Sequence, residues 1–358
     1  MGVLARYFIR EFFKLLIIFQ TVFIAIYLMI DFASGIDDFI KAGSPGSVMF
    51  AYFAYKVPSI AVQILPAATL TTVIVMFSLM QKNNEIISLK ACGATVWKIS
   101  QPIVIATMFL SVGLFLFSEV IVPITSSKAN DIWRIDVKKE RQASFHGRNH
   151  IWHKGKNSIY WIKQFNNVKK IMVEPTFYFF DSSFHLIRRI DARSASWKNG
   201  VWQVREGISQ DLDRDGTYKM TRFKGLDLRL PERPEDFVRV EREPEEMGYE
   251  QLRRFAERLR DEGYDATRYF VDINIKIAFP FVILIMALLG IPVALWKRQV
   301  STPVAVSLGI VLCFAYLLVL GLSRTLGFAG ILPPLVSAWL ANGIFFFVGI
   351  YLMINVNR

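Results

Sequence analysis

The chain has 358 residues, a formal net charge of +12 and a composition that is 53% hydrophobic, including 30 phenylalanines. Its mean hydropathy of +0.35 indicates membrane insertion and excludes disordered and collagen-like classes. Two cysteines, Cys92 and Cys313, are too few for a disulfide scaffold, and their apolar surroundings predict free thiols. The charges are concentrated, because 29 of the 42 basic and 23 of the 30 acidic residues lie within 123–270. This distribution predicts one soluble block between two apolar ones.

Six apolar segments are long enough, or nearly so, to cross a bilayer, which requires about 20 helical residues. The uncharged runs are 15–30, 57–81, 99–118, 277–296, 299–323 and 325–357. Apolar residues after Asp31 extend the first run, and Gly330, Pro333 and Pro334 turn the chain before the last span. The sequence therefore predicts an α+β membrane protein with three spans in 1–122, a soluble domain in 123–268 and three spans in 269–358.

Basic residues near the ends of the spans predict the orientation, because Lys and Arg in short loops resist translocation. Nine lie on the side of the N-terminus: Arg6, Arg10, Lys14, Lys82, Lys90, Lys98, Lys297, Arg298 and Arg358. The opposite short loops carry Lys41 and Lys56, with Arg324 near one end. We therefore expect both termini in the cytoplasm and the soluble block outside. A cleaved signal peptide is the alternative for the first segment, but its apolar run is longer than usual.

The soluble block changes to a β-type pattern. Short apolar runs separated by turn residues predict strands at 151–152, 159–162, 176–180, 184–190, 194–197, 201–204 and 218–223. Seven short strands indicate a sandwich or a jelly roll. Six aromatic residues either line a groove between its sheets or fill its core: Trp152, Trp161, Phe177, Phe179, Trp197 and Trp202. After the strands, 245–261 has the periodicity of an amphipathic helix that lies beside the membrane or against the β-domain.

Motifs for catalysis are missing from the sequence. There is no phosphate-binding loop of the G-x-x-x-x-G-K-[ST] type, so another chain must hydrolyse ATP if ATP drives this protein. The stretch 211–216 resembles the start of a calcium loop, but Arg222 occupies its twelfth position, which favours a hairpin turn. His150 and His153 would lie on opposite faces of a strand. We therefore predict no enzyme activity, no metal and no bound cofactor.

The segment 83–93, between the second and third spans, is predicted to be a short cytoplasmic helix. Asn83 and Asn84 can cap it, Glu85 favours its N-terminal dipole, and Gly93 is placed to end it. Ile86 and Leu89 share one face of this helix. Two interpretations remain open: the helix lies flat on the membrane, or it inserts into a groove on a soluble partner.

Charges in or near the membrane are costly and therefore informative. Asp272 and Lys276 are four residues apart at the start of the fourth span, close enough for an ion pair within the helix. The predicted topology gathers four cations on the outer side: Lys41, Lys56, Lys128 and Arg134. They either extend to lipid headgroups or form a basic rim for an anionic amphiphile whose acyl chains contact the apolar walls below.

This arrangement of spans, β-domain, amphipathic helix and further spans resembles the LptF/LptG permeases of lipopolysaccharide export over the entire chain. The stretch 84–93 is similar to the coupling helix of that family, and Arg268-Tyr269 with Lys276 and Pro280 resembles the entry to its fourth span. Three motifs look more like LptG than LptF: Lys41-Ala42-Gly43, Ile151-Trp152-His153-Lys154 and Gly330-Ile331-Leu332-Pro333-Pro334.

The resemblance implies an inner-membrane heterodimer of LptF and LptG, with a β-jellyroll-like periplasmic domain in each subunit. Two copies of the ATPase LptB would bind the coupling helices, with Glu85, Ile86, Leu89 and Gly93 at the contact, and LptC would join near the first span. Lipopolysaccharide would enter between the first and fifth spans and meet Lys41, Lys128, Arg134 and Arg324. Asp37 and Asp38 place acid near this rim, where a divalent cation is conceivable.

The sequence thus predicts a non-catalytic permease subunit that extracts lipopolysaccharide from the outer leaflet of the inner membrane, uses ATP through a partner, and contacts membrane lipids but no nucleic acid. The paralogous LptF subunit is one alternative. A gradient-driven transporter would need charges deep within its spans. A membrane-tethered binding or scaffold protein would leave the coupling-like helix without a role.

Overall fold

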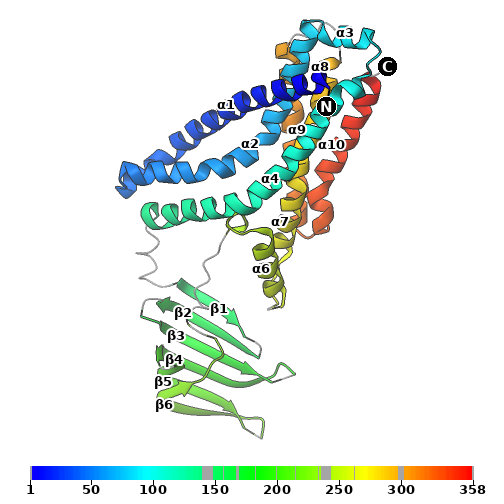
Figure 1. The fold of residues 1–358 in the computed structure, drawn as a ribbon. Helices are drawn as coiled ribbons and strands as arrows, with labels where there is room; N and C mark the ends of the chain where they lie inside the picture. The colour runs from blue at the N-terminus through cyan, green and yellow to red at the C-terminus, as the bar shows by residue number, and fades with distance from the viewer. Residues whose placement is uncertain are drawn as a thin grey trace. The chain divides into compact units, whose positions relative to one another are not determined.

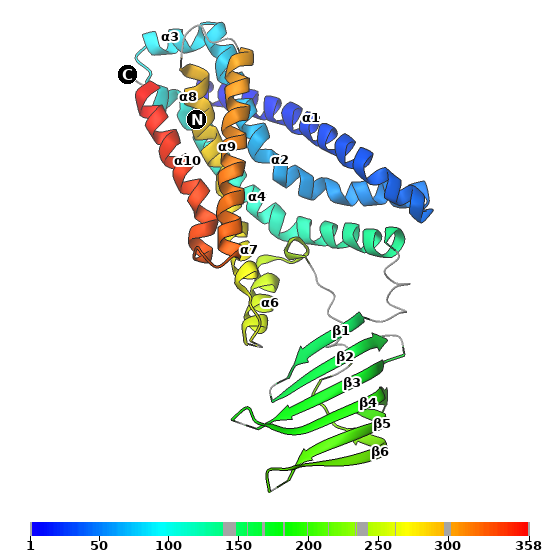
Figure 2. The same ribbon diagram turned by 180° about the vertical axis from the view of Figure 1, so that it is seen from behind.

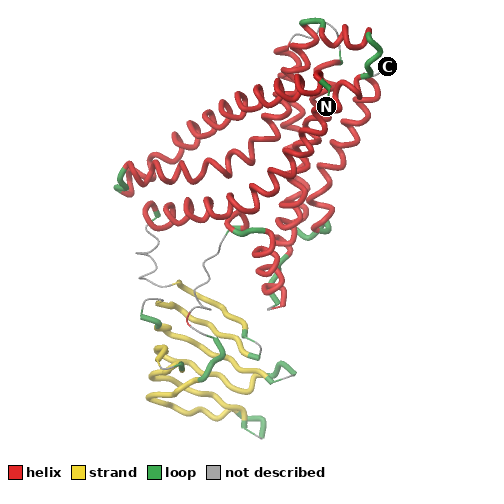
Figure 3. The backbone as a smooth tube through the Cα atoms, in the orientation of Figure 1, coloured by secondary structure: helices red, strands yellow, loops and turns green. Residues whose placement is uncertain are grey.

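The computed structural model describes residues 2–138, 148–155, 157–166, 169–181, 183–198, 200–213, 215–232, 234, 243–261, 263–296 and 302–356. The chain divides into two compact units, which are considered separately. The helical unit comprises Met1–Ile132, Glu243–Arg260 and Asp265–Arg358, and the sheet unit comprises Trp133–Arg242 and Asp261–Tyr264. Figure 1 labels the helices of the first unit and the strands β1 to β6 of the second, and Figure 3 colours the helices red and the strands yellow.

Among the described residues, six apolar helical stretches are long enough to cross a membrane, as predicted. They are formed by α1 (Val3–Ala42), α2 (Gly46–Lys82), α4 (Val96–Ile132), α7 (Thr267–Ala278) with α8 (Val282–Leu295), α9 (Thr302–Phe328) and α10 (Pro334–Val356). The first helix is much longer than its uncharged run, because a helix can continue past Arg10, Lys14 and Asp31 with these side chains at its surface. The chain is therefore a multi-pass membrane protein.

The packing of these helices is uneven. In the most apolar window of each span, 61% of the residues are buried for α2 and 78% for α7–α8, against only 6% for α1 and 17% for α9. The close approach of α8 to α2 depends on Gly290, where an added Cβ would lie 3.0 Å from Val73 Cγ1. The second and fourth spans thus form the core, whereas the first and fifth expose apolar faces. Both cysteines are free, as predicted.

The amphipathic helix α6 (Tyr249–Asp261) follows a short 3₁₀ turn, η3 (Pro244–Glu246), and begins later than predicted. Its buried residues are Leu252, Ala256 and Leu259. Leu252 and Ala256 belong to a cluster that includes Ile273 of α7. Part of the apolar face of α6 therefore packs against α7.

The sheet unit contains β1 (Arg148–Lys154), β2 (Ser158–Asn166), β3 (Ile171–Phe180), β4 (Leu186–Lys198), β5 (Val201–Leu212) and β6 (Tyr218–Leu228). They form one antiparallel sheet in chain order. Among the described strands, the crossed connections of a jelly roll are absent, since each strand pairs with its neighbour in sequence. The two strands predicted at 184–190 and 194–197 are one strand, β4. The stretch 211–216 ends in a hairpin turn, as predicted, where Gly216 N–H donates to Asp213 O at 3.1 Å.

A row of charged side chains crosses the sheet. It explains why the sequence pattern predicted two strands where the structure has the single strand β4. On the successive strands β2 to β5, a charged residue lies in each gap between the paired residues of the register: Lys163, Glu174, Arg193 and Glu206. Glu174 and Glu206 have left-handed φ angles of 47° and 48°, which interrupt the alternation of faces along β3 and β5. Lys163 pairs with Glu174 at 2.6 Å and Arg193 with Glu206 at 3.1 Å. Apolar residues on both sides of this row consequently reach the same core.

The core of the sheet unit takes up most of the predicted aromatic residues. Phe177 and Trp202 are fully buried, Phe179 and Trp197 pack against the same cluster, and Trp161 is half-buried, whereas Trp152 is exposed. The indole Nε1–H of Trp202 donates to Glu232 O at 3.1 Å. The core interpretation of these aromatics therefore holds better than the groove interpretation.

Candidate functional site

The short helix α3 (Glu85–Ala91) joins α2 to α4, as the sequence predicted. Figures 1 and 2 show it at the end of the helical unit where α1 begins and α10 ends. Asn84 precedes α3 with a φ of 62°, and its side chain makes no capping hydrogen bond. Gly93 ends the segment with a φ of 81°, a left-handed conformation that glycine adopts without strain. Because two spans meet at α3, a force applied to it reaches both.

The apolar face of α3 points into the chain itself. Ile86 is only 3% exposed and belongs to the core built by α1, α2 and α4, and Leu89 packs against the same core. The contact of Ile86 and Leu89 with a partner groove stays a prediction, and in the chain by itself both side chains face its own core. The two apolar side chains of this seven-residue helix are buried against the neighbouring helices of the same chain. This contact holds α3 in place, because so short a helix is marginal by itself.

The outer side of α3 is polar. Glu85 is half-buried and is held by two neighbours: Tyr7 Oη–H of α1 donates to Glu85 Oε2 at 3.2 Å, and Asn83 Nδ2–H donates to Oε1 at 3.4 Å. Lys90 and Trp97 are exposed nearby in sequence. This end of the helical unit thus presents an oriented carboxylate, a cation and an aromatic ring, which suits contact with a protein surface.

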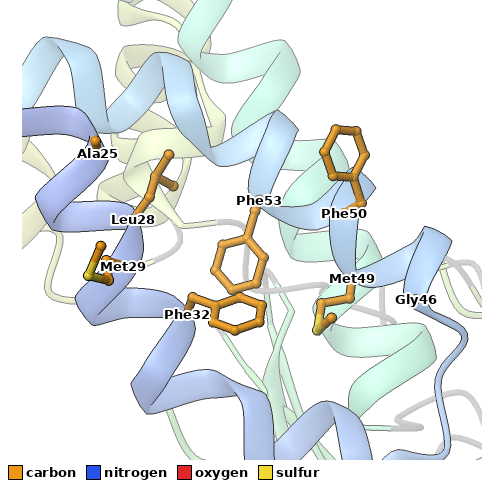
Figure 4. Close-up of a pocket in the computed structure, with 8 residues that line it drawn as sticks. All are labelled: Ala25, Leu28, Met29, Phe32, Gly46, Met49, Phe50 and Phe53. Atoms are coloured by element: carbon orange, nitrogen blue, oxygen red, sulfur yellow. The ribbon is translucent and has the colours of Figure 1, made fainter. Parts of the chain in front are cut away.

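An apolar pocket lies between α1 and α2, near the loop that joins them. It has a volume of about 610 Å³. Its lining residues are Ala25, Leu28, Met29, Phe32, Gly46, Met49, Phe50 and Phe53. Figure 4 shows the rings of Phe32 and Phe53 facing each other, with Met29 and Phe50 farther out on either helix. A pocket without charged or polar side chains can hold a hydrocarbon chain. Sequence reasoning missed it, although the four-residue spacing of Leu28 and Phe32, and of Met49 and Phe53, was a signal.

The predicted basic rim is only partly assembled. Lys56 Nζ lies 2.7 Å from Asp31 Oδ2 and joins α1 to α2. Lys128 Nζ lies 5.2 Å above the ring of Tyr55, a cation–π contact between α4 and α2. Lys41 is exposed in the last turn of α1. Lys41 and Lys128 are both exposed, whereas Lys56 is held by Asp31.

Two further predicted cations lie elsewhere. Arg134 belongs to η1 (Trp133–Val137) of the sheet unit. Arg324 Nη2 of α9 lies 2.8 Å from Asp272 Oδ1 of α7. The predicted pair of Asp272 with Lys276 is therefore replaced by a pair across two helices, because the Asp272 carboxylate is directed toward α9. Lys276 lies within electrostatic range of Glu119, Glu245 and Asp272.

Metal-ligating side chains do not gather in the described part of the chain, where no three His, Cys, Asp or Glu residues could share an ion. Asp37 and Asp38 are exposed on α1. His153 stacks on Tyr160 at 5.9 Å between ring centroids, and the side chain of His150 lies outside the described residues. Lys297, Arg298 and Arg358, three of the nine predicted cytoplasmic cations, also lie outside them.

Residues 6–355 match the family described as lipopolysaccharide export system permease LptF/LptG. No curated protein matches the chain.

Proposed function

Because the chain belongs to the LptF/LptG family of lipopolysaccharide export permeases, we propose that it is one transmembrane half of an ATP-driven extractor, and that it is the LptG-type half. In this proposal the chain hydrolyses nothing itself. A separate LptB-type ATPase dimer binds α3, an LptF-type chain supplies the other half, and LptC joins near α1. The observation that carries the proposal is α3, a helix seated by Ile86 that presents Glu85 on its polar side.

The exposed apolar faces support the heterodimer. Of the six spans found among the described residues, the first and fifth are the least buried. Apolar surface of this kind is normally covered by lipid or by another chain. A second permease that contributes the same two spans would enclose a cavity with two lateral openings. These openings lead to the outer leaflet of the inner membrane if the sheet unit is periplasmic and both termini are cytoplasmic, as the basic residues favour.

The pocket between α1 and α2 supports a lipid substrate. An acyl chain fits its uniformly apolar lining, and Lys41, in the same helix as Leu28 and Met29, is the cation that we assign to a phosphate of lipopolysaccharide. Each CH₂ group that leaves an apolar environment for water costs about 0.8 kcal/mol. A lipid with several chains therefore leaves the membrane slowly without an energy source, which is the reason for an ATPase partner.

The docking step is tested with Glu85→Arg in the full complex, purified in nanodiscs that contain lipopolysaccharide. We expect loss of lipopolysaccharide-stimulated ATP hydrolysis or loss of the ATPase from the complex. Tyr7→Phe is the matched control, because it removes the hydrogen bond to Glu85 and leaves the carboxylate in place. Normal ATP-dependent lipid release by the Glu85→Arg complex would overturn the docking role of α3.

The assignment of Lys41 is tested by photocrosslinking lipopolysaccharide to the complex. Lys41→Asp should reduce the crosslinked fraction, whereas Lys14→Asp, at the other end of the same helix, should not. Equal crosslinking in wild type and Lys41→Asp would remove the phosphate-binding role. Purification of the chain as a homomer that moves solutes without any ATPase would favour the gradient-driven alternative.

A further inference from the structure

The fourth span is not one helix. It consists of α7 and α8, separated by a 3₁₀ turn, η4 (Phe279–Phe281), with Pro280 inside that turn. Proline has no N–H group and interrupts the ladder of helical hydrogen bonds. Within a bilayer, a backbone carbonyl without a donor is costly, so a broken span persists only where other groups supply the missing hydrogen bonds.

Side chains from two other spans hydrogen-bond the backbone carbonyls at the break. Asn342 of α10 donates from Nδ2–H to Ala278 O at 2.8 Å, and Ser111 of α4 donates from Oγ–H to Pro280 O at 2.7 Å. Both Asn342 and Ser111 are buried. Carbonyls of η4 and of the residue before it are thus bonded by side chains of two different helices.

Tyr316 of α9 orients Asn342. Its Oη–H donates to Asn342 Oδ1 at 2.8 Å, and both side chains are almost completely buried. Because the amide oxygen accepts from Tyr316, the amide NH₂ group is the part that faces Ala278 O. The third, fifth and sixth spans therefore all meet the break, and none of the hydrogen bonds described there involves α3 or the apolar pocket.

The two halves of the fourth span are held differently. Every residue of α8 except Leu284 is buried, and Gly290 lets α8 lie directly against α2. The half α7 packs against α10 and is also joined to the end of α9. The Asp272 carboxylate, whose residue is only 4% exposed, pairs with Arg324. The guanidinium groups of Arg268 and Arg324 lie 5.3 and 5.1 Å from the ring centroid of Phe328.

We propose that η4 is a hinge, at which α7 and the Arg324 end of α9 move together as one body while α8 stays fixed in the core. Asn342 is the positioning residue that holds the hinge. Tyr316, which donates to Asn342, marks the position along α9 about which its Arg324 end moves. In the context of the proposed function, on which this use of the hinge rests, the movement changes the width of the opening beside the fifth span without disturbing the packing at α3.

Two variants act on the hinge in opposite directions. Asn342→Leu removes the donor to Ala278 O and the acceptor for Tyr316, and should loosen the hinge. Pro280→Ala restores an N–H group at the break and should stiffen it. One hydrogen bond is worth up to about 1.4 kcal/mol, which corresponds to about a tenfold change in the ratio of the two positions.

Distances between spin labels in the full complex report the movement directly. In a chain with Cys92→Ser and Cys313→Ser, a label at Phe109→Cys on α4 is combined with Thr325→Cys at the end of α9 or with Asp265→Cys before α7. Phe109, Thr325 and Asp265 are exposed. A label pair at Phe109→Cys and Tyr351→Cys of α10 is the control for the fixed part.

In Asn342→Leu, we expect the first two distance distributions to broaden by a similar amount. In Pro280→Ala, we expect both to narrow. The distribution of the control pair should stay unchanged in both variants. Unchanged distributions in both variants would overturn the hinge, as would independent changes of the α7 and α9 labels. Equal broadening of the control pair would also overturn it, since that result means general loosening. These distances do not depend on the docking of α3, so the hinge and the proposed function fail separately.

Discussion

The seating of α3 leads to a prediction for Ile86→Ala. Helices of fewer than about 12–15 residues are marginal in water on their own, and α3 has seven residues with Ile86 as its only buried one. The helix therefore depends on this side chain for its stability. Its removal should release α3 from the core while the spans on both sides remain folded.

The size of the effect follows from the burial of Ile86. Replacement of a buried isoleucine by alanine costs about 2–5 kcal/mol, and the 3% exposure of Ile86 places it fully within that class. Opening of α3 is a local event, so this cost appears in the local equilibrium rather than in global unfolding. A cost of at least about 2 kcal/mol raises the open population roughly 30-fold.

The population in which α3 is open can be measured by amide hydrogen exchange with mass spectrometry on the intact chain in nanodiscs. Peptides that cover 85–93 should exchange roughly 30-fold faster in Ile86→Ala than in wild type, whereas peptides from α8 should be unchanged. The matched control is Ser88→Ala, because Ser88 is exposed and alanine favours the helix. Exchange at 85–93 equal to wild type would refute the seating, and faster exchange in α8 as well would show that α3 does not open alone.

Two more predictions concern other parts of the chain. Trp202→Phe removes the donor to Glu232 O and part of a buried ring, and should lower the free energy of unfolding of the sheet unit by about 1–3 kcal/mol; a calorimetric transition at the wild-type temperature would contradict it. Partial desolvation, together with the neighbouring Glu243, raises the pKa of the Glu245 carboxyl above its ordinary value of 4.5, so its contribution to stability is complete below that value and is lost as the pH rises through the raised pKa. Its charged neighbours are Glu243, Asp272, Lys276 and Arg324. Glu245→Gln should therefore flatten the decline of thermal stability above pH 4.5, and the same slope in both proteins would contradict the assignment.

The six spans could be predicted because the bilayer imposes a minimum length of apolar helix, which composition alone reveals. The strands were harder. Alternation of apolar residues is the signal for a strand, and it fails in β4 at Arg193, where the charged row crosses the sheet. One strand therefore has the sequence pattern of two, and only the pairing with β3 and β5 shows that it is continuous.

The site was predictable in position but not in orientation. The sequence located α3 and its ends, yet an apolar face on a short helix looks the same whether it meets a partner or the chain's own core, and Ile86 meets the core. The spacing of Asp272 and Lys276 suggested a local pair, whereas Arg324, 52 residues away, is the actual partner of Asp272. Such long-range contacts leave no periodic signal in a single sequence.

The charged row has a mechanical consequence for the sheet unit. If β4 slid along β5 by two residues, Arg193 would no longer face Glu206, and the interrupted alternation at Glu206 would bring polar side chains into the core. The pair of Arg193 with Glu206 joins β4 to β5, and the pair of Lys163 with Glu174 joins β2 to β3. Each pair therefore favours the observed register of its own two strands.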